Sequence, residues 1–377
     1  MNDLQNPDEN YIEYLKKSDL PLVLYGAGDV AQSFFEKVIV PQDIAVNGVI
    51  VSNEYYRPNS TFHGLSIQPL EKILNESLKA DIILCFRESN YDHIVKELKN
   101  IAPDCNFFIG YGIKLKRDML RFEVHICDHC NLNCKSCDHF SPIAEKRFVD
   151  LDILQRDFSR LSQLSNRKCE VIDLMGGEPL LHPKIIEVFD IARKHFDTTV
   201  RLVTNGILLA NQPDEFWKNC DKNRITILVS AYPIQINEKK IKAQAHKFGV
   251  TLEQPRQKFG EKDWYQRWTP DFTGSRNILT AFRNCDIGNV CLFLEDGKLA
   301  TCGLPLYAKH FNKYFNHSEV KFDEPTQEDY VDIFKVSSLD EILTKVARPI
   351  PYCRYCKPDN VKFGKWGPSE RKMEEWI

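Results

Sequence analysis

The 377-residue sequence lacks several features that would point to particular classes of protein. It has no excess of positive charge: 50 Lys and Arg residues against 53 Asp and Glu residues give a net charge of −3, so no nucleic acid is expected as a partner. It has no apolar run of membrane-spanning length. The N-terminal stretch MNDLQNPDENYIEYLKK lacks the apolar region of a signal peptide. We therefore expect a cytoplasmic protein without a membrane span.

Cysteine, by contrast, is abundant, with 13 residues. Disulfides are reduced in the cytosol, so clustered cysteines there favour metal binding or catalysis. In CNLNCKSC, Cys130, Cys134 and Cys137 have the spacing C-x3-C-x2-C. Three thiolates can hold three corners of a [4Fe–4S] cluster and leave one iron open. A zinc ion would need a fourth ligand, such as His129 or His139, and structural zinc sites usually use separated cysteine pairs.

The sequence predicts an α/β fold that begins with a small Rossmann-like parallel sheet in residues 1–117. The stretch LPLVLYGAGDVAQSFFEKVIV is typical of a strand, a glycine turn and a helix, and further strands are expected at 45–52, 80–86 and 105–110. Gly26, Gly28 and Ala31 fit the dinucleotide-binding pattern G-x-G-x-x-A. The expected acidic residue after the second strand is not evident, since only Glu54 is near. A bound nucleotide and a purely structural or docking role both stay open.

The pattern of residues 118–284 predicts a second α/β region. Strands are expected at 122–127, 170–177, 198–206, 225–233 and 250–254, with helical segments between them. This repetition predicts a partial (β/α) barrel, whose chemistry lies where strands end and loops begin. The cysteine triplet and the stretch GGEP both fall at that edge. Residues 255–284 lack a clear period, which favours a loop or lid.

Three motifs in this region, in this order, resemble those of the radical S-adenosylmethionine (radical SAM) enzymes. The first is the cysteine triplet, and the second is the glycine-rich stretch after the second strand. The third is the TNG stretch after the next strand, followed by a serine at the end of the fourth. By resemblance, the residues near S-adenosylmethionine are Gly176, Gly177, Glu178, Pro179, Thr204, Asn205 and Ser230.

The resemblance implies that a [4Fe–4S] cluster on Cys130, Cys134 and Cys137 binds S-adenosylmethionine, and that its reductive cleavage gives a 5′-deoxyadenosyl radical. A flavodoxin or ferredoxin would supply the electron. One departure from the family pattern is Ser136, where members usually carry a large apolar residue near the adenine; Phe140 could cover the adenine instead. Cys127, on the first barrel strand, is a candidate hydrogen donor to a substrate radical, and core packing is the alternative.

Residues 285–377 form a small cysteine-rich extension, predicted to begin with a β-hairpin over 289–303 that turns at Asp296–Gly297. It resembles the auxiliary-cluster regions called SPASM and twitch domains. The implied ligands of an auxiliary [4Fe–4S] cluster are Cys285, Cys302, Cys353 and Cys356, although four cysteines would satisfy zinc equally well. Cys291 is left over, as a replacement ligand for Cys285, a packed thiol or a hydrogen donor. A short helix is expected at 368–377.

The function expected from these motifs is hydrogen-atom abstraction from a small-molecule substrate, with the N-terminal region favouring a carbohydrate or a nucleotide-linked sugar. A peptide-modifying radical SAM enzyme is one alternative, because auxiliary clusters are common in that branch. A non-catalytic iron–sulfur sensor or scaffold is a second, although it would not require the GGEP stretch. An NAD oxidoreductase would leave the cysteine triplet unexplained.

Overall fold

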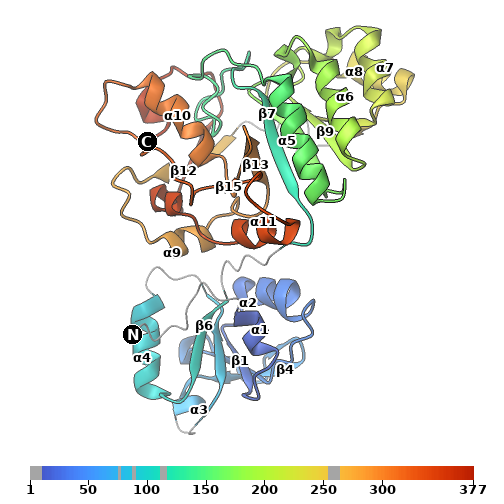
Figure 1. The fold of residues 1–377 in the computed structure, drawn as a ribbon. Helices are drawn as coiled ribbons and strands as arrows, with labels where there is room; N and C mark the ends of the chain where they lie inside the picture. The colour runs from blue at the N-terminus through green and yellow to red at the C-terminus, as the bar shows by residue number, and fades with distance from the viewer. Residues whose placement is uncertain (1–10, 75–77, 87–90, 111–116, 254–263) are drawn as a thin grey trace. The chain divides into compact units, whose positions relative to one another are not determined.

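The computed structural model describes residues 11–74, 78–86, 91–110, 117–253 and 264–377. The chain forms two compact units, residues 1–113 and residues 114–377 (Figure 1). Within the described residues, no helix is long and apolar enough to cross a membrane.

A mostly parallel sheet forms the centre of the first unit. Its strand order is β3-β4-β2-β1-β5-β6, and every neighbouring pair is parallel except β3 with β4. The central strands are enclosed, with Leu24 and Ile83 fully buried. The predicted small Rossmann-like sheet is confirmed. Its elements are α1 Tyr11–Leu15, β1 Leu22–Tyr25, α2 Asp29–Phe34, β2 Gly48–Val51, β3 Thr61–Phe62, β4 Leu65–Pro69, α3 Glu71–Leu74, β5 Asp81–Leu84, α4 Tyr91–Ile101 and β6 Asn106–Ile109.

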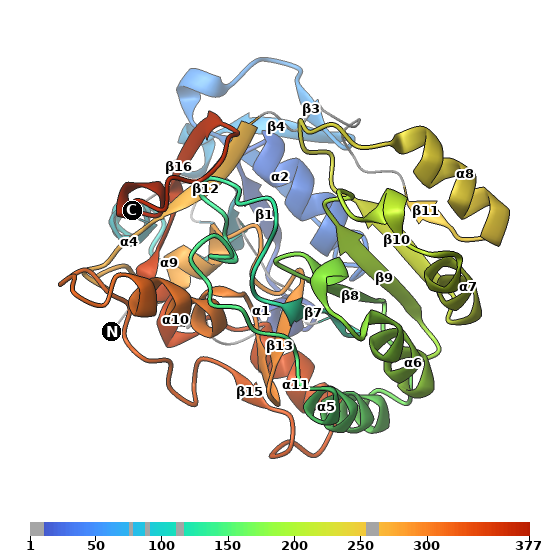
Figure 2. The same ribbon diagram turned by 90° about the horizontal axis from the view of Figure 1, so that it is seen from above.

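The second unit is built on an eight-stranded sheet of order β11-β10-β9-β8-β7-β13-β14-β15. Strands β7 to β11 are parallel and neighbour one another in chain order, with helices α5 to α8 along one face of the curved sheet (Figure 2). The sheet stays open, as predicted for a partial barrel. Its elements are β7 Arg121–Cys127, α5 Leu151–Leu164, β8 Val171–Gly176, α6 Ile185–His195, β9 Thr199–Thr204, α7 Asp214–Lys222, β10 Ile225–Val229, α8 Glu238–Phe248 and β11 Leu252–Glu253.

The two faces of this sheet differ in chemistry because side chains alternate along a strand. On β7, Phe122 and Val124 belong to the hydrophobic core that the helices complete. Glu123 lies between these two residues and points to the opposite face. It is in register with Asp173 of β8, which is in register with Arg201 of β9. The face turned away from the helices therefore carries a row of charged side chains.

The C-terminal region adds three strands to this sheet: β13 Leu292–Glu295, β14 Lys298–Ala300 and β15 Val331–Asp332. Strand β13 pairs parallel with β7 and antiparallel with β14. The turn between β13 and β14 is Asp296–Gly297, with φ of 48° and 76°, as tight hairpins require. The predicted hairpin is confirmed.

The prediction of a loop over 255–284 is wrong for the part that the structure describes; residues 254–263 lie outside the described residues. Strand β12, Trp264–Pro270, pairs antiparallel with β16, Cys356–Lys365. The predicted helix at 368–377 is reduced to the 3₁₀ turn η6, Met373–Glu375. The remaining elements are η1 Phe35–Ile39, η2 Asn53–Tyr55, η3 Pro179–Leu181, η4 Leu209–Asn211, α9 Ile278–Arg283, α10 Leu304–Tyr314, α11 Leu339–Val346 and η5 Pro351–Tyr355.

Candidate functional site

The loop after β7 carries the three predicted cluster cysteines. Asn133 and Ser136 adopt positive φ values of 52° and 56°, so the loop winds tightly between the thiols. Burial raises the pKa of Cys130 to about 11 and that of Cys137 to about 12, and the neighbouring Cys134 contributes to both shifts. Without a metal, the thiols of Cys130 and Cys137 therefore hold their protons, and metal binding would release those protons.

The glycine pair after β8 lies directly against the base of this loop. A Cβ on Gly176, whose φ is +131°, would stand 2.3 Å from the Cys127 carbonyl oxygen. A Cβ on Gly177 would stand 2.1 Å from the His129 carbonyl oxygen. The Gly177 N–H donates to the Cys127 carbonyl at 2.6 Å. Glycine is required here because two backbone segments touch.

The Glu178 side chain joins the second and third motifs. It is fully buried and accepts hydrogen bonds from Thr204 Oγ1 at 2.7 Å and from the Asn205 backbone N–H at 2.9 Å. Burial raises the pKa of this carboxyl, and the same hydrogen bonds oppose the shift. Glu178 thus fixes the turn that follows β9, and the buried Pro179 begins η3.

Asn205 links that turn to the cysteine loop. Its Nδ2 donates to Asn131 Oδ1 at 2.8 Å and lies 3.7 Å from Cys130 Sγ. The Ser230 backbone N–H, after β10, donates to the Thr204 carbonyl at 2.9 Å. All predicted cofactor residues of this region therefore lie at one edge of the sheet, beside the cluster loop.

Two neighbours of the loop were missed from the sequence. Tyr232 lies beside the three cysteines, and burial together with Cys134 and Cys137 raises the pKa of its hydroxyl. The second neighbour is the C-terminal tail: the Lys135 N–H donates to the Gly367 carbonyl at 2.8 Å, and Trp376 Nε1 donates to the Cys137 carbonyl at 3.0 Å. A lone Trp in the charged stretch KMEEWI was the one available signal for this contact.

Ser136, where the family pattern expects a large apolar residue, faces the tail. Its side chain is 4% exposed, and its Oγ donates to the Glu375 carbonyl at 2.7 Å. Phe140, considered above as a cover for adenine, is 1% exposed and packs with Phe311 and Trp376 in a hydrophobic core. Neither side chain is thus an open surface against which a base could stack.

Four cysteines of the C-terminal region converge. Burial raises the pKa of Cys302, and nearby Cys356, Cys353 and Cys285 raise it further. They come from the loop after α9, the end of the hairpin, η5 and the start of β16. Cys291 lies apart from them, with its Sγ 3.8 Å from Glu123 Oε2. Of the three roles considered for Cys291, replacement of Cys285 is therefore not favoured by the geometry.

The spacing of the sulfurs bears on which metal they fit. Among the described residues, one set of three ligand atoms lies mutually within 4.8 Å, and it contains no cysteine. Zinc bound at about 2.3 Å by tetrahedral thiolates needs sulfurs about 3.8 Å apart. The closely grouped set is therefore distinct from both cysteine groups.

Cys127, the candidate hydrogen donor, is 1% exposed. Its Sγ lies 3.0 Å from His129 Nδ1 and contacts the His129 carbonyl at 3.1 Å. Burial raises the pKa of this thiol to about 12. The thiol is therefore protonated and held at the base of the cluster loop.

In the first unit, Gly26 and Gly28 follow β1, which lies between β2 and β5, where the strand order reverses direction. Gly26 has φ of +117°, and a Cβ there would stand 2.7 Å from the Cys85 carbonyl oxygen. A Cβ on Gly28 would meet no atom within 4 Å, and Glu54 is exposed in a 3₁₀ turn after β2. In open α/β sheets such a switch point is where ligands bind.

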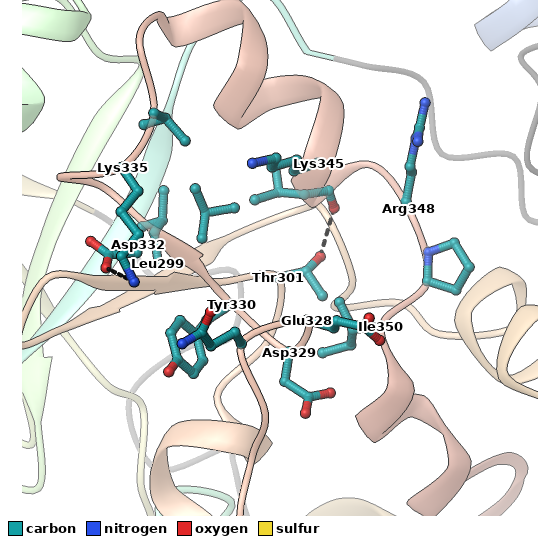
Figure 3. Close-up of a pocket in the computed structure, with 15 residues that line it drawn as sticks. Leu299, Thr301, Glu328, Asp329, Tyr330, Asp332, Lys335, Lys345, Arg348 and Ile350 are labelled. Atoms are coloured by element: carbon teal, nitrogen blue, oxygen red, sulfur yellow. Dashed lines mark hydrogen bonds and ion pairs between the residues drawn. The ribbon is translucent and has the colours of Figure 1, made fainter.

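A cavity of about 430 Å³ also opens in the C-terminal region, between α11 and the hairpin strands (Figure 3). Its lining combines Lys335, Lys345 and Arg348 with the acidic Glu328 and Asp332. None of the described residues that line it is a cysteine or another predicted site residue. The cavity is therefore a separate feature from both cysteine groups.

An open α/β sheet with parallel strands β7 to β11 defines a partial-barrel protein, with three cysteines after β7 and a glycine pair at the end of β8. Residues 124–253 match the sequence model described as the Radical SAM superfamily. The chain contains a radical SAM domain.

Curated relatives match over part of the chain. The GTP 3′,8-cyclase of Microcystis aeruginosa is 37% identical over 100 residues, which are 25% of this chain and 29% of the cyclase. The enzyme of the same name from Desulforamulus reducens is 30% identical over 115 residues, 29% of this chain and 34% of the relative. The chain thus spans about a third or less of these relatives.

Solved structures show more distant likeness. BtrN in complex with AdoMet and 2-DOIA is 14% identical, with a TM-score of 0.34 over 54% of this chain and 85% of BtrN. Native anSMEcpe with bound AdoMet and a Cp18Cys peptide is 19% identical, with a TM-score of 0.29 over 36% of this chain and 42% of that one.

Proposed function

We propose that this chain is a radical SAM enzyme that cleaves S-adenosylmethionine reductively and removes a hydrogen atom from a small-molecule substrate. The observation that carries this proposal is the contact of Asn205 with the cysteine loop, together with the hydrogen bonds that tie Glu178 to Thr204 and Asn205. These contacts join three motifs from three successive strands, which a purely structural cluster would not require.

Cys130, Cys134 and Cys137 would hold a [4Fe–4S] cluster by three corners, and S-adenosylmethionine would take the fourth. Bound together, the two groups supply a 5′-deoxyadenosyl radical, with methionine as the second product. Gly176 and Gly177 hold the loop close to β8. The cofactor would lie along the edge formed by Gly176, Gly177, Glu178, Pro179, Thr204, Asn205 and Ser230, because these residues lie next to the loop.

The first test is anaerobic reconstitution of the full chain, reduction with dithionite, addition of S-adenosylmethionine, and chromatography for 5′-deoxyadenosine. We expect product from the wild type and none from C130A/C134A/C137A. The matched control is Cys85→Ala, which removes one buried thiol from the other unit. A fully iron-loaded wild type that fails to bind S-adenosylmethionine would contradict the proposal and favour a sensor or scaffold.

Cys285, Cys302, Cys353 and Cys356 would bind a second [4Fe–4S] cluster, in the manner of a twitch domain. Their convergence from four segments supports a metal site, and the resemblance to twitch domains favours a cluster over zinc. Mössbauer spectroscopy of the ⁵⁷Fe-reconstituted C130A/C134A/C137A variant tests this assignment. A four-iron signal is expected there, and zinc without iron would refute it.

The substrate class proposed is a carbohydrate or nucleotide-linked sugar, and the electron donor a flavodoxin or ferredoxin. Two observations support this class: the glycine turn at the switch point of the first unit, and relatives over part of the chain that are named for a nucleotide, GTP. A peptide substrate is the competing proposal. Calorimetric titration of the full chain with nucleotide sugars separates the two proposals, because only the first expects binding. Gly26→Val should abolish this binding.

A further inference from the structure

Buried polar atoms without a hydrogen-bond partner gather on the face of β7 that is turned away from the helices. In native proteins nearly all buried polar atoms are hydrogen-bonded, so each exception asks for a missing partner. Five residues here contribute such atoms: Glu123 Oε1, His125 Nδ1, Asp128 Oδ1, Tyr307 OH and His310 Nε2. His125 Nδ1 and Asp128 Oδ1 lie 3.4 Å apart as an ion pair, whereas Glu123 Oε1 has no hydrogen-bond partner. Their grouping indicates an absent ligand.

Three side chains at this place offer the donor atoms of a metal site. The ligand atoms of Glu123, His125 and His139 all lie within 4.8 Å of one another. His125 Nε2 lies 2.6 Å from His139 Nδ1, and that nitrogen lies 3.9 Å from Glu123 Oε1. Two imidazoles and one carboxylate form the set that binds zinc and non-haem iron.

The second ring nitrogen of His125 faces a carboxylate, as metal-binding histidines usually require. His125 Nδ1 lies 3.4 Å from Asp128 Oδ1. Asp128 is itself held by Arg147 at 3.4 Å and lies 3.7 Å from His310. Tyr307 stacks on the His125 ring with a centroid distance of 3.8 Å and an interplanar angle of 5°. Nε2 of His125 hydrogen-bonds to His139 Nδ1, so a cation bound by both rings would replace that hydrogen bond.

We propose that Glu123, His125 and His139 bind one divalent transition-metal cation of the Zn²⁺ or Fe²⁺ class. Three protein ligands leave coordination positions for water or for an oxygen atom of a substrate. The site uses no cysteine, and its occupation does not depend on S-adenosylmethionine cleavage, so it goes beyond the proposed function.

The test uses the full chain, with its cysteine sites reconstituted with iron and sulfide and excess metal then removed. Zn²⁺ is added, and equilibrium dialysis and zinc K-edge absorption are measured. We expect one tightly bound zinc with nitrogen and oxygen neighbours at about 2.0–2.1 Å, whereas zinc on cysteine has sulfur at about 2.3 Å. The ligand distances therefore separate this site from any failure of cluster assembly.

Glu123→Gln preserves shape and should weaken zinc binding at least tenfold, as should His139→Ala. Asp128→Asn should weaken it about 10- to 100-fold while leaving all three ligands in place. The matched control is His195→Ala, which removes another buried imidazole, at the end of α6, and should leave zinc affinity unchanged. Equal zinc binding by the wild type and E123Q, or a shell of sulfur alone, would overturn the proposal.

Discussion

Gly177 shows how one absent methyl group positions the cluster loop. A Cβ on this residue would stand 2.1 Å from the His129 carbonyl oxygen, a backbone atom that cannot move alone. Gly177→Ala should therefore displace the loop and lower the yield of 5′-deoxyadenosine at least tenfold. Gly48→Ala is the control, because its Cβ would lie at an ordinary 3.8 Å from Val23. Equal iron content and product from both variants would contradict this argument.

Glu123 should make the stability of the metal-free protein depend on pH. Burial, and next the nearby Asp173, raise the pKa of this carboxyl from 4.5 to about 8. The folded protein therefore holds this proton more tightly than the unfolded chain does. The contribution of Glu123 to the free energy of unfolding is complete below pH 4.5 and is lost as the pH rises to 8, by at most about 1.4 kcal/mol per pH unit. The other groups that face it are Asp138, Arg121, His139 and Cys291.

The measurement for this prediction is urea unfolding of the wild type and Glu123→Gln at several pH values, with a chelator present. The free energy of unfolding of the wild type should fall relative to that of the variant as the pH rises from 5 to 8. The reason is that glutamine at position 123 does not titrate. Parallel stability curves would contradict the prediction.

The C-terminal tail, residues 366–377, acts as a cover for the cysteine loop. Trp376 is fully buried, packs with Phe140 and donates to the Cys137 carbonyl. Trp376→Ala should cost about 3–5 kcal/mol of unfolding free energy. It should also speed the loss of cluster absorbance in air. Trp376→Phe keeps most of the packing without the N–H donor, so its unfolding free energy should lie between the two. A cluster equally durable in all three proteins would contradict the role as a cover.

The elements that the sequence predicted correctly are those whose signal is local. Strands β7 to β10 and their helices show apolar periodicity within one segment, and the turn at Asp296–Gly297 is encoded by two adjacent residues. Strand β12 was missed because WYQRWTP shows no alternation and is stabilised by pairing with β16, about 90 residues away. The tail was misread as a helix because its partners lie in the cysteine loop.

At the scale of the molecule, the same distinction separates the predicted site from the missed one. The cysteines and the glycine pair could be predicted as a site because the spacing of each motif lies within a few residues. Tyr232 and the grouping of Glu123 and His125 with His139 were not predicted, because these residues come together only in the folded protein. His139 was considered as a fourth zinc ligand beside the cysteines. His125 and Glu123 alone are ordinary residues of a strand.

The whole chain should carry two separable clusters, and its iron content is the direct measure. Once a chelator has emptied the Glu123, His125 and His139 site, reconstituted protein should hold about eight irons, four for each cluster. Cys130→Ala with C134A and C137A should leave about four irons and no S-adenosylmethionine cleavage. Cys302→Ala with C353A should also leave about four, but should retain cleavage, because none of the described contacts of the first cysteine loop involves these two residues. Loss of all iron in either variant, with folding intact by circular dichroism, would mean that the seven cysteines serve one cooperative site.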